Sequence, residues 1–281
     1  MVDLEYLAED WNFPFLIKTM KKERLERTLK EGRFCFTTPS TFIGGDGLAS
    51  AQQDRFEAHL SFKAYHLMVA PILYEDKDGP HYGPAEKFAS QAQMHVITDD
   101  AKHTPLCSFR YVDPTELIEK YGAYFFRLGN TVDRIKDEFK HNAFIFILAP
   151  QVFGHRLFQK APCFSYKVHY GDINLKFNKF IEQVGYQTAS LFQKDPLYQW
   201  QQEFRIILEP KEKEGKHFIE IGSIEDIAFG GELEQLRNGF IICESSDHLK
   251  EVNQILAQEK LTIDDIFSAE NKGEPSDKPN N

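Results

Sequence analysis

The sequence has few of the features that mark the commonest special classes of protein. Among 281 residues there are 4 cysteines, and none has the Cys-x-x-Cys spacing of a zinc or redox site. The longest apolar run, 143–150, is too short for a membrane helix, which needs about 20 residues. The N-terminus lacks the basic and apolar regions of a signal peptide. We therefore expect a cytoplasmic protein with free thiols, no metal site and no membrane association.

Positively charged residues are fewer than negatively charged ones. The chain has 33 Lys and Arg residues against 43 Asp and Glu residues, which gives a formal charge of −10. An acidic surface repels nucleic-acid phosphates, which argues against broad non-specific nucleic-acid binding but does not exclude a local basic pocket. Part of the acid lies in 75–78 and 270–277, so the remaining body is less acidic than the total implies.

Phenylalanine, by contrast, is abundant. There are 25 phenylalanines, and the hydrophobic fraction of 42% is ordinary for a globular protein. Many of these rings lie in short apolar segments, where they are expected to fill a core between strands and helices. Single cores grow to about 250–300 residues, so we expect one compact domain over 1–268. The polar composition of 269–281 predicts a disordered C-terminal tail.

Hydrophobic periodicity predicts an α+β fold with a mostly antiparallel, split sheet and peripheral helices. Strands 202–208 and 217–221 are expected to pair across the charged turn 211–216. The segments expected to be helical are 21–30, 85–93, 113–122, 130–140, 173–192, 232–238 and 247–259.

The segment 198–208 is the most informative for chemistry. On a strand, Glu203 and Arg205 alternate with Phe204 and Ile206 and therefore share one face. Gln201, two residues before Glu203, would join that face and present an amide beside a carboxylate. The alternative is a solvated sheet face on which Glu203 and Arg205 merely pair, because structural ion pairs are common.

Two separated blocks carry a family resemblance. The first runs from Phe15 through Leu25, Leu29 and Gly32 to Phe42, and the second contains Trp200-x-x-Glu203-x-Arg205. With Asp54-Arg-Phe-Glu57 between them, they resemble an uncharacterised bacterial domain-of-unknown-function family. Its members show a Phe-Asn-Asp-Pro-Phe-Glu block and a late Trp-x-x-Glu-x-Glu-x-Arg. The similarity reaches from about Phe15 to Gly230, and Gln201 stands where the family has its first glutamate.

The residue pattern of these blocks is also similar, more loosely, to that of the ADP-ribosyltransferase superfamily. That superfamily places a basic residue, a small hydroxyl residue and a Gln/Glu-x-Glu on three strands around an NAD cleft. The resemblance implies Glu203, Gln201 and Ser108 as catalytic residues, and NAD as the co-substrate. It further implies that cations and aromatic rings bind the pyrophosphate and the nicotinamide of NAD, the candidates being Lys18, Phe109, Arg110, Tyr111 and Tyr124.

Three functions remain open at this point. The first is an NAD-dependent transferase, a toxin or defence protein that modifies a protein or nucleic-acid target. The second is a non-catalytic acidic interaction or inhibitor protein, for example in phage–host conflict. The third is a metal-dependent nuclease or hydrolase using Asp54 and Glu57. The run Gly44–Gly47 matches neither a P-loop nor a dinucleotide motif and is expected to be a surface turn.

Overall fold

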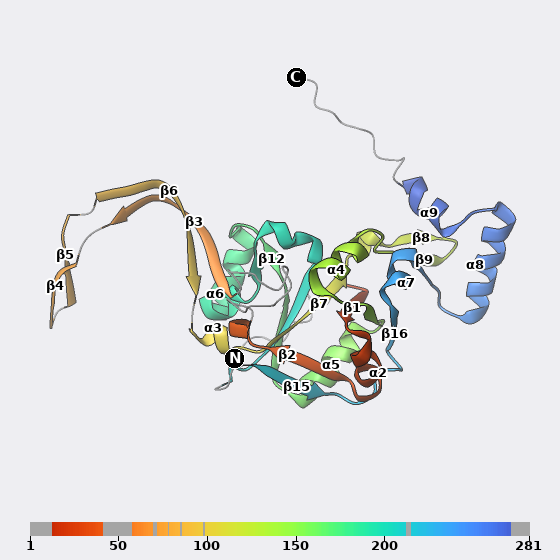
Figure 1. The fold of residues 1–281 in the computed structure, drawn as a ribbon. Coiled ribbons are helices and arrows are strands. Elements are labelled where there is room, and N and C mark those ends of the chain that lie inside the picture. Colours follow the sequence, from red (N-terminus) through yellow and green to blue (C-terminus); the bar gives the residue numbers. More distant parts are fainter. Residues whose placement is uncertain are drawn as a thin grey trace, which may run out of the picture. The chain divides into compact units, whose positions relative to one another are not determined.

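The chain consists of two compact units that alternate along the sequence. Figure 1 labels helices and strands of both units. The computed structural model describes residues 13–41, 58–69, 72–77, 79–84, 86–97, 99–211 and 215–270. Unit 1 comprises Met1–Asp10, Phe34–Ser108 and Leu157–Ile219, and unit 2 comprises Trp11–Arg33, Phe109–Arg156 and Glu220–Asn281. Each unit is described by itself. The single domain expected over 1–268 stays a prediction.

Both units combine helices with strands that pair mainly in the antiparallel sense, which confirms the predicted α+β class. Four elements have residues in both units: β2 (Arg33–Thr37), β7 (Leu106–Val112), α5 (Pro150–Lys160) and β15 (Lys216–Glu220). Within the described ranges, none of the helices has both the length and the apolar character needed to cross a membrane.

Unit 1 contains most of the strands on which the candidate site depends. Its elements are η1 (Pro39–Thr41), β3 (His59–Val69), β4 (Ile72–Asp76), β5 (Gly79–Tyr82), β6 (Glu86–Ile97), α3 (Asp99–His103), β11 (Cys163–Lys167), β12 (His169–Tyr170), α6 (Leu175–Ser190), β13 (Gln193–Lys194), η4 (Pro196–Gln201) and β14 (Glu203–Leu208). In the sheet order, β14 lies between β11 and β7. The predicted hairpin between 202–208 and 217–221 is wrong, because β15 pairs with β2 instead.

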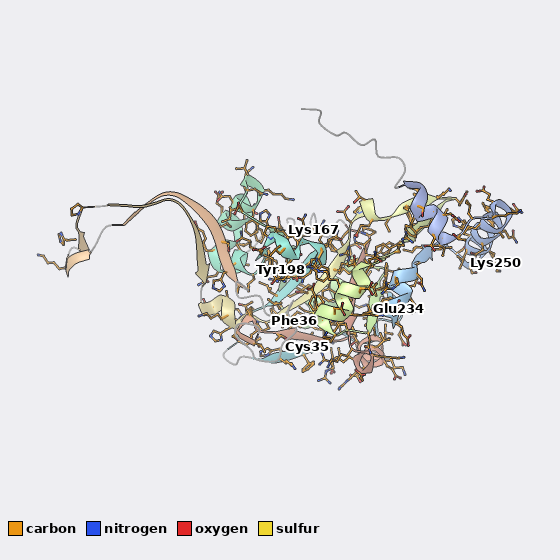
Figure 2. The ribbon with its side chains drawn as sticks, turned by 45° about the horizontal axis from the view of Figure 1, so that its top comes forward. Cys35, Phe36, Lys167, Tyr198, Glu234 and Lys250 are labelled. Atoms are coloured by element: carbon orange, nitrogen blue, oxygen red, sulfur yellow. The ribbon has the colours of Figure 1, made fainter. Side chains whose placement is uncertain are left out.

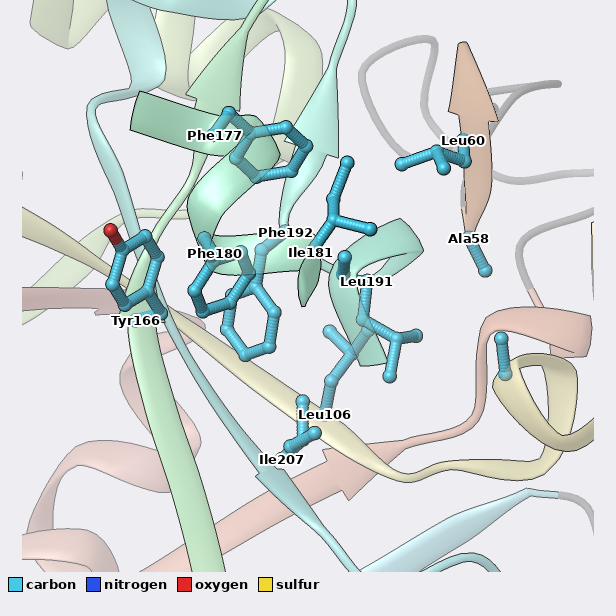
Figure 3. Packing of buried hydrophobic residues seen from close by; sticks show 12 residues of the cluster. Ala58, Leu60, Leu106, Tyr166, Phe177, Phe180, Ile181, Leu191, Phe192 and Ile207 are labelled. Carbon is cyan, nitrogen blue, oxygen red and sulfur yellow. The ribbon is translucent and has the colours of Figure 1, made fainter. Parts of the chain in front are cut away.

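The core of unit 1 forms between helix α6 and the strands beside it (Figure 3). Asn174 caps α6 by accepting a hydrogen bond from the Phe177 amide at 2.9 Å, and the helix then buries one aromatic face. The Tyr166 ring stacks on Phe180 with 4.0 Å between ring centroids. As predicted, Gly185 interrupts the helix, with φ at 82°. This packing secures the strands that carry the site.

Unit 2 is built around β10, a strand buried at every position. Its elements are β1 (Phe15–Met20), α2 (Lys22–Glu31), η3 (Pro114–Glu116), β8 (Ile118–Lys120), β9 (Ala123–Phe126), α4 (Thr131–Phe139), β10 (Ala143–Ile147), β16 (Ala228–Glu232), α7 (Leu233–Asn238), β17 (Phe240–Ile242), α8 (Ser246–Glu259) and α9 (Ile263–Glu270). Strand β10 pairs antiparallel with β1 and β16. The Phe146 ring stacks on Phe229 at 5.3 Å, as expected for phenylalanines that fill a core.

Two predicted helices are absent from the described structure. Residues 86–93 belong to β6, because pairing with β3 outweighs the helix propensity of Ala, Glu, Lys and Gln. At 113–122 the capping box of Asp113 and Glu116 is present, but it starts only the 3₁₀ turn η3. The chain is already extended at Leu117 and then pairs with β9 as β8.

Candidate functional site

Strand β14 places a carboxylate and a guanidinium inside unit 1. All six residues of β14 are buried, and the strand has a hydrogen-bonded neighbour on each edge. Glu203 and Arg205 share a face as predicted, and Arg205 Nε donates to Glu203 Oε2 at 2.7 Å. The alternative expectation was a solvated sheet face on which Glu203 and Arg205 pair, and only the pairing is found. The pair forms, but Arg205 is only 1% exposed.

The Glu203 carboxylate has two further donors. Ser108 Oγ donates to Oε2 at 3.1 Å, and Lys194 Nζ donates to Oε1 at 2.8 Å. We call Ser108, Lys194, Gln201, Glu203 and Arg205 the Glu203 cluster. Its charged members sum to one positive charge, from two cations and one anion. A buried charge of this kind is tolerated only when it is paired and hydrogen-bonded, as it is here.

Gln201 joins the Glu203 cluster by a route that the sequence did not predict. It is the last residue of η4, and Gln202 takes the left-handed conformation with φ at 43°, so β14 begins only at Glu203. Lys194 Nζ nevertheless donates to Gln201 Oε1 at 2.9 Å and so bridges the amide and the carboxylate. Gln201 is 6% exposed, and its Nε2 donor has no hydrogen-bond partner among the described residues.

Charge keeps the Glu203 carboxyl ionised. Burial by itself would raise the pKa of Glu203, but the charges and hydrogen bonds of Arg205 and Lys194 outweigh it and hold the pKa well below its ordinary value of 4.5. A group with so low a pKa does not donate a proton near neutral pH. Glu203 can therefore serve as a fixed negative charge or a hydrogen-bond acceptor, but not as a general acid.

Two tyrosines line the Glu203 cluster. The Glu203 amide donates to the hydroxyl oxygen of Tyr170 at 2.8 Å, which ties the start of β14 to β12. Lys194 Nζ lies 4.8 Å from the centroid of the Tyr198 ring, a cation–π distance. Tyr198 is half-buried on η4 (Figure 2). The Glu203 cluster thus combines an anion, two cations and an amide, and the two tyrosines contact it.

The predicted cofactor-binding residues lie in unit 2. Lys18 Nζ is 5.3 Å from the centroid of the Phe109 ring, and that ring is buried against Phe153. The guanidinium of Arg110 forms an ion pair with Glu116. With these contacts, Phe109 and Arg110 have structural roles, and their assignment to NAD stays a prediction.

The two predicted tyrosines of unit 2 are in different sheets. Tyr111 lies in β7, where burial first, and then the charges of Asp113 and Glu116, raise the pKa of its hydroxyl. Tyr124 lies in β9, is 41% exposed, and belongs to the three-stranded sheet β17–β9–β8. The two rings thus belong to different sheets, and their assignment to the stacking of nicotinamide stays a prediction.

Other predicted positions fall outside the described residues, namely Gly44–Gly47, Asp54 and Glu57. Among the residues that are described, no three His, Cys, Asp or Glu side chains form a group able to hold a metal ion. The four cysteines all lie in the described ranges, and none forms a disulfide.

Sequence reasoning missed the role of Lys194. This lysine directly follows Leu191, Phe192 and Gln193, and it is only 7% exposed. A cation close in sequence to a strand that carries a glutamate is the signal that would have indicated an ion pair.

Comparisons with protein-family models, with curated proteins and with solved structures find no match for this chain. The resemblances to the domain-of-unknown-function family and to the ADP-ribosyltransferases therefore stay predictions. The argument for a function rests on the geometry of the Glu203 cluster.

Proposed function

We propose that the Glu203 cluster is the centre of an NAD-binding site of the ADP-ribosyltransferase kind. One observation carries the proposal. Ser108 and Gln201, the other two catalytic residues implied by the resemblance, both lie in the Glu203 cluster, although Ser108 is 95 positions from Glu203 in the sequence. Residues selected by a pattern in the sequence thus meet around one carboxylate.

The chemistry requires a carboxylate that stays ionised. When the bond between the ribose C1 atom and the nicotinamide nitrogen breaks, the electron pair leaves with nicotinamide and the ribose gains positive charge. A carboxylate that accepts a hydrogen bond from a ribose hydroxyl stabilises this charge. The lowered pKa of Glu203 suits it to this task. Water or a nucleophile of a protein or nucleic-acid target then attacks C1 and loses its proton.

Substrate binding would change the partner of one oxygen of Glu203. Lys194 Nζ now donates to Oε1, and a ribose hydroxyl would take its place. Lys194 would keep its bond to Gln201 Oε1 and its position over Tyr198. Ser108 would act as a positioning residue, because its bond to Oε2 fixes the plane of the carboxylate.

A non-catalytic interaction protein is the second candidate, and one observation favours it. Each oxygen of Glu203 already accepts a hydrogen bond from a buried cation. Such ion pairs are often structural, and here the pair would simply hold β13 and β14 together. On this alternative, the acidic surface binds a partner, for example as an inhibitor.

Glu203→Gln tests the first candidate. The variant keeps the side-chain volume but loses the charge, so we expect nicotinamide release from NAD to fall by about 100-fold or more. Release is measured by chromatography with purified protein, in the presence and absence of candidate targets. Glu209→Gln, an exposed glutamate just after β14, is the matched control and should retain wild-type release.

Loss of a buried charge can also unfold the protein, so a milder variant is needed. Ser108→Ala removes one hydrogen bond to the Glu203 carboxylate but keeps both neighbouring cations, so it should lower nicotinamide release by about 10-fold while the protein stays folded, which the thermal unfolding midpoint checks. Wild-type release from a folded Glu203→Gln variant would contradict the proposal. No release and no NAD binding by the wild type would favour the second candidate.

A further inference from the structure

A pocket in unit 1 has no role in the proposed function, and we call it the Phe218 pocket. Its volume is about 360 Å³, at the small end of the range of about 300–1,000 Å³ that is usual for small-molecule sites. The residues directly after α5, the end of β14 and most of β15 form its walls. The lining residues are Ala161, Pro162, Leu208, Glu209, Lys211, Lys216, His217, Phe218 and Ile219. None of them belongs to the Glu203 cluster.

Hydrogen bonds to neighbouring segments hold two walls of the Phe218 pocket in place. At the end of β14, the Leu208 amide donates to the Pro105 carbonyl at 2.9 Å. At the start of β15, which lies along β2 (Figure 1), the Thr38 amide donates to the Gly215 carbonyl at 3.1 Å. The Gly215 amide in turn donates to Thr38 Oγ1 at 2.9 Å. The walls are therefore formed before any ligand binds, and binding need not order them.

The charged residues of the Phe218 pocket favour an anion. Lys211 and Lys216 are both exposed, and neither forms an ion pair with any residue that the structure describes. Glu209 is the acid in the lining, so two cations stand against one anion and the formal charge is +1 with histidine neutral. The chain as a whole carries a charge of −10, so this pocket is a local exception. Lysine ammonium groups bind carboxylate and phosphate oxygens as point charges.

The other walls of the Phe218 pocket are largely apolar. Phe218 itself is 48% exposed, which leaves half of a large aromatic side chain open to contact. Side chains alternate along a strand, so Phe218 and Lys216 share the exposed face of β15, about 7 Å apart. Pro162 and Leu208 add further apolar surface. A flat apolar body placed against Phe218 would thus bring an anionic group that it carries close to Lys216.

We infer that the Phe218 pocket binds a small organic anion, with a flat apolar body against Phe218 and a carboxylate or phosphate group at Lys211 and Lys216. Burial of the apolar body supplies the larger part of the affinity, and the two lysines select the sign of the charge. A cationic ligand is disfavoured because both ammonium groups repel it. This inference is independent of the proposed function, since it involves no residue of the Glu203 cluster.

Titration with 2-naphthoate tests the inference. This probe has a flat apolar body and one carboxylate, and we expect saturable binding that shifts the amide NMR signals of Leu208, Phe218 and Ile219. The neutral 2-naphthamide has nearly the same shape but no charge, so it should bind about 3-fold more weakly or worse. 2-Naphthyl phosphate distinguishes the two anionic groups: tighter binding than that of 2-naphthoate assigns a phosphate, and weaker binding assigns a carboxylate.

Substitutions of the charged residues should act in opposite directions. Lys216→Gln should weaken binding of 2-naphthoate by about 3-fold, and Lys211→Gln/Lys216→Gln by about 10-fold. Glu209→Gln removes a negative charge and should strengthen binding by about 2-fold. Lys179→Gln changes an exposed lysine of α6 outside the pocket, so it is the matched control and should bind as the wild type does. All four side chains are exposed, so the thermal unfolding midpoints should remain those of the wild type.

Three results would each overturn the inference. The first is the absence of a saturable shift at Leu208, Phe218 and Ile219 up to the solubility limit of 2-naphthoate. The second is equal affinity for 2-naphthoate and 2-naphthamide, which would show that the lysines do not select an anion. The third is a folded Lys211→Gln/Lys216→Gln variant that binds 2-naphthoate as tightly as the wild type does.

Discussion

Gly32 ends helix α2 in unit 2 and allows another segment to pass close to the backbone. Its φ of 58° is in the left-handed region, and Ile221 donates its amide hydrogen to the Gly32 carbonyl at 3.2 Å. A Cβ atom on Gly32 would lie 2.1 Å from the carbonyl oxygen of Gly222, far inside contact distance. Conformation and close approach therefore both require glycine at this position.

Gly32→Ala should accordingly be among the more destabilising single substitutions in unit 2. The left-handed conformation costs about 1 kcal/mol for alanine, and displacement of the Gly222 backbone should bring the loss to roughly 3 kcal/mol or more. Urea denaturation measures the loss. The control is Gly129→Ala, where φ is 52° but no atom lies within 4 Å of the added Cβ. Equal losses in the two variants would show that the close approach is unimportant.

At the scale of elements, one glutamine connects two sheets of unit 1. Gln193 of β13 is 2% exposed, and besides its two bonds to Ser61 it donates to the Gly171 carbonyl at 2.7 Å. The same residue therefore secures the start of β3 and the loop after β12. Because the amide both donates and accepts, no apolar residue of the same size can replace it.

Gln193→Met should loosen this connection while preserving the packed volume. Loss of three buried hydrogen bonds is expected to lower the free energy of unfolding by roughly 2–4 kcal/mol. It should also speed hydrogen exchange of the Ser61 amide relative to amides in β10. Exchange followed by mass spectrometry or NMR measures the effect. Unchanged protection of Ser61 would mean that β3 keeps its position without Gln193.

The helices and strands also show where predictions from local sequence patterns are correct. Helices α2, α4 and α8 were predicted from apolar residues at helical spacing, and each lies within about two residues of its expected ends. Residues 86–93 and 117–122 were predicted to be helical and are not, because pairing of β6 with β3 and of β8 with β9 decides their conformation. Helix α5 was not predicted, although Pro150 at its first position is a helix-start signal.

For the whole molecule, acid is expected to reduce stability through His141. Burial first, and then the charges of Lys18, Arg24 and Lys21, lower the pKa of His141 from 6.5 to about 4. Its Nδ1 lies 2.8 Å from Thr19 Oγ1, which helps to fix the ring inside unit 2. The unfolded chain therefore takes up a proton as the pH falls from 6.5 towards 4, while the folded chain does not.

The free energy of unfolding should thus decrease by about 2 kcal/mol from His141 alone between neutral pH and about pH 5. Urea denaturation across this range measures the decrease, and His141→Gln should reduce it. His155→Gln controls for the loss of a histidine as such. A His141→Gln variant with the full wild-type decrease would contradict the assignment. Glu203 adds to the loss only below its ordinary pKa of 4.5, because its pKa is lowered and its stabilising ion pairs persist above that pH.

Local patterns along the chain account for the features that neighbouring residues set. The periodic helices, the all-buried phenylalanine strand β10 and the shared face of Glu203 and Arg205 follow from side-chain spacing alone. Tertiary structure alone decided that Lys194 and Ser108 meet Glu203, that β15 pairs with β2, and that 86–97 is a strand. These contacts join segments far apart along the chain, and their energies depend on burial and pairing that no local pattern contains.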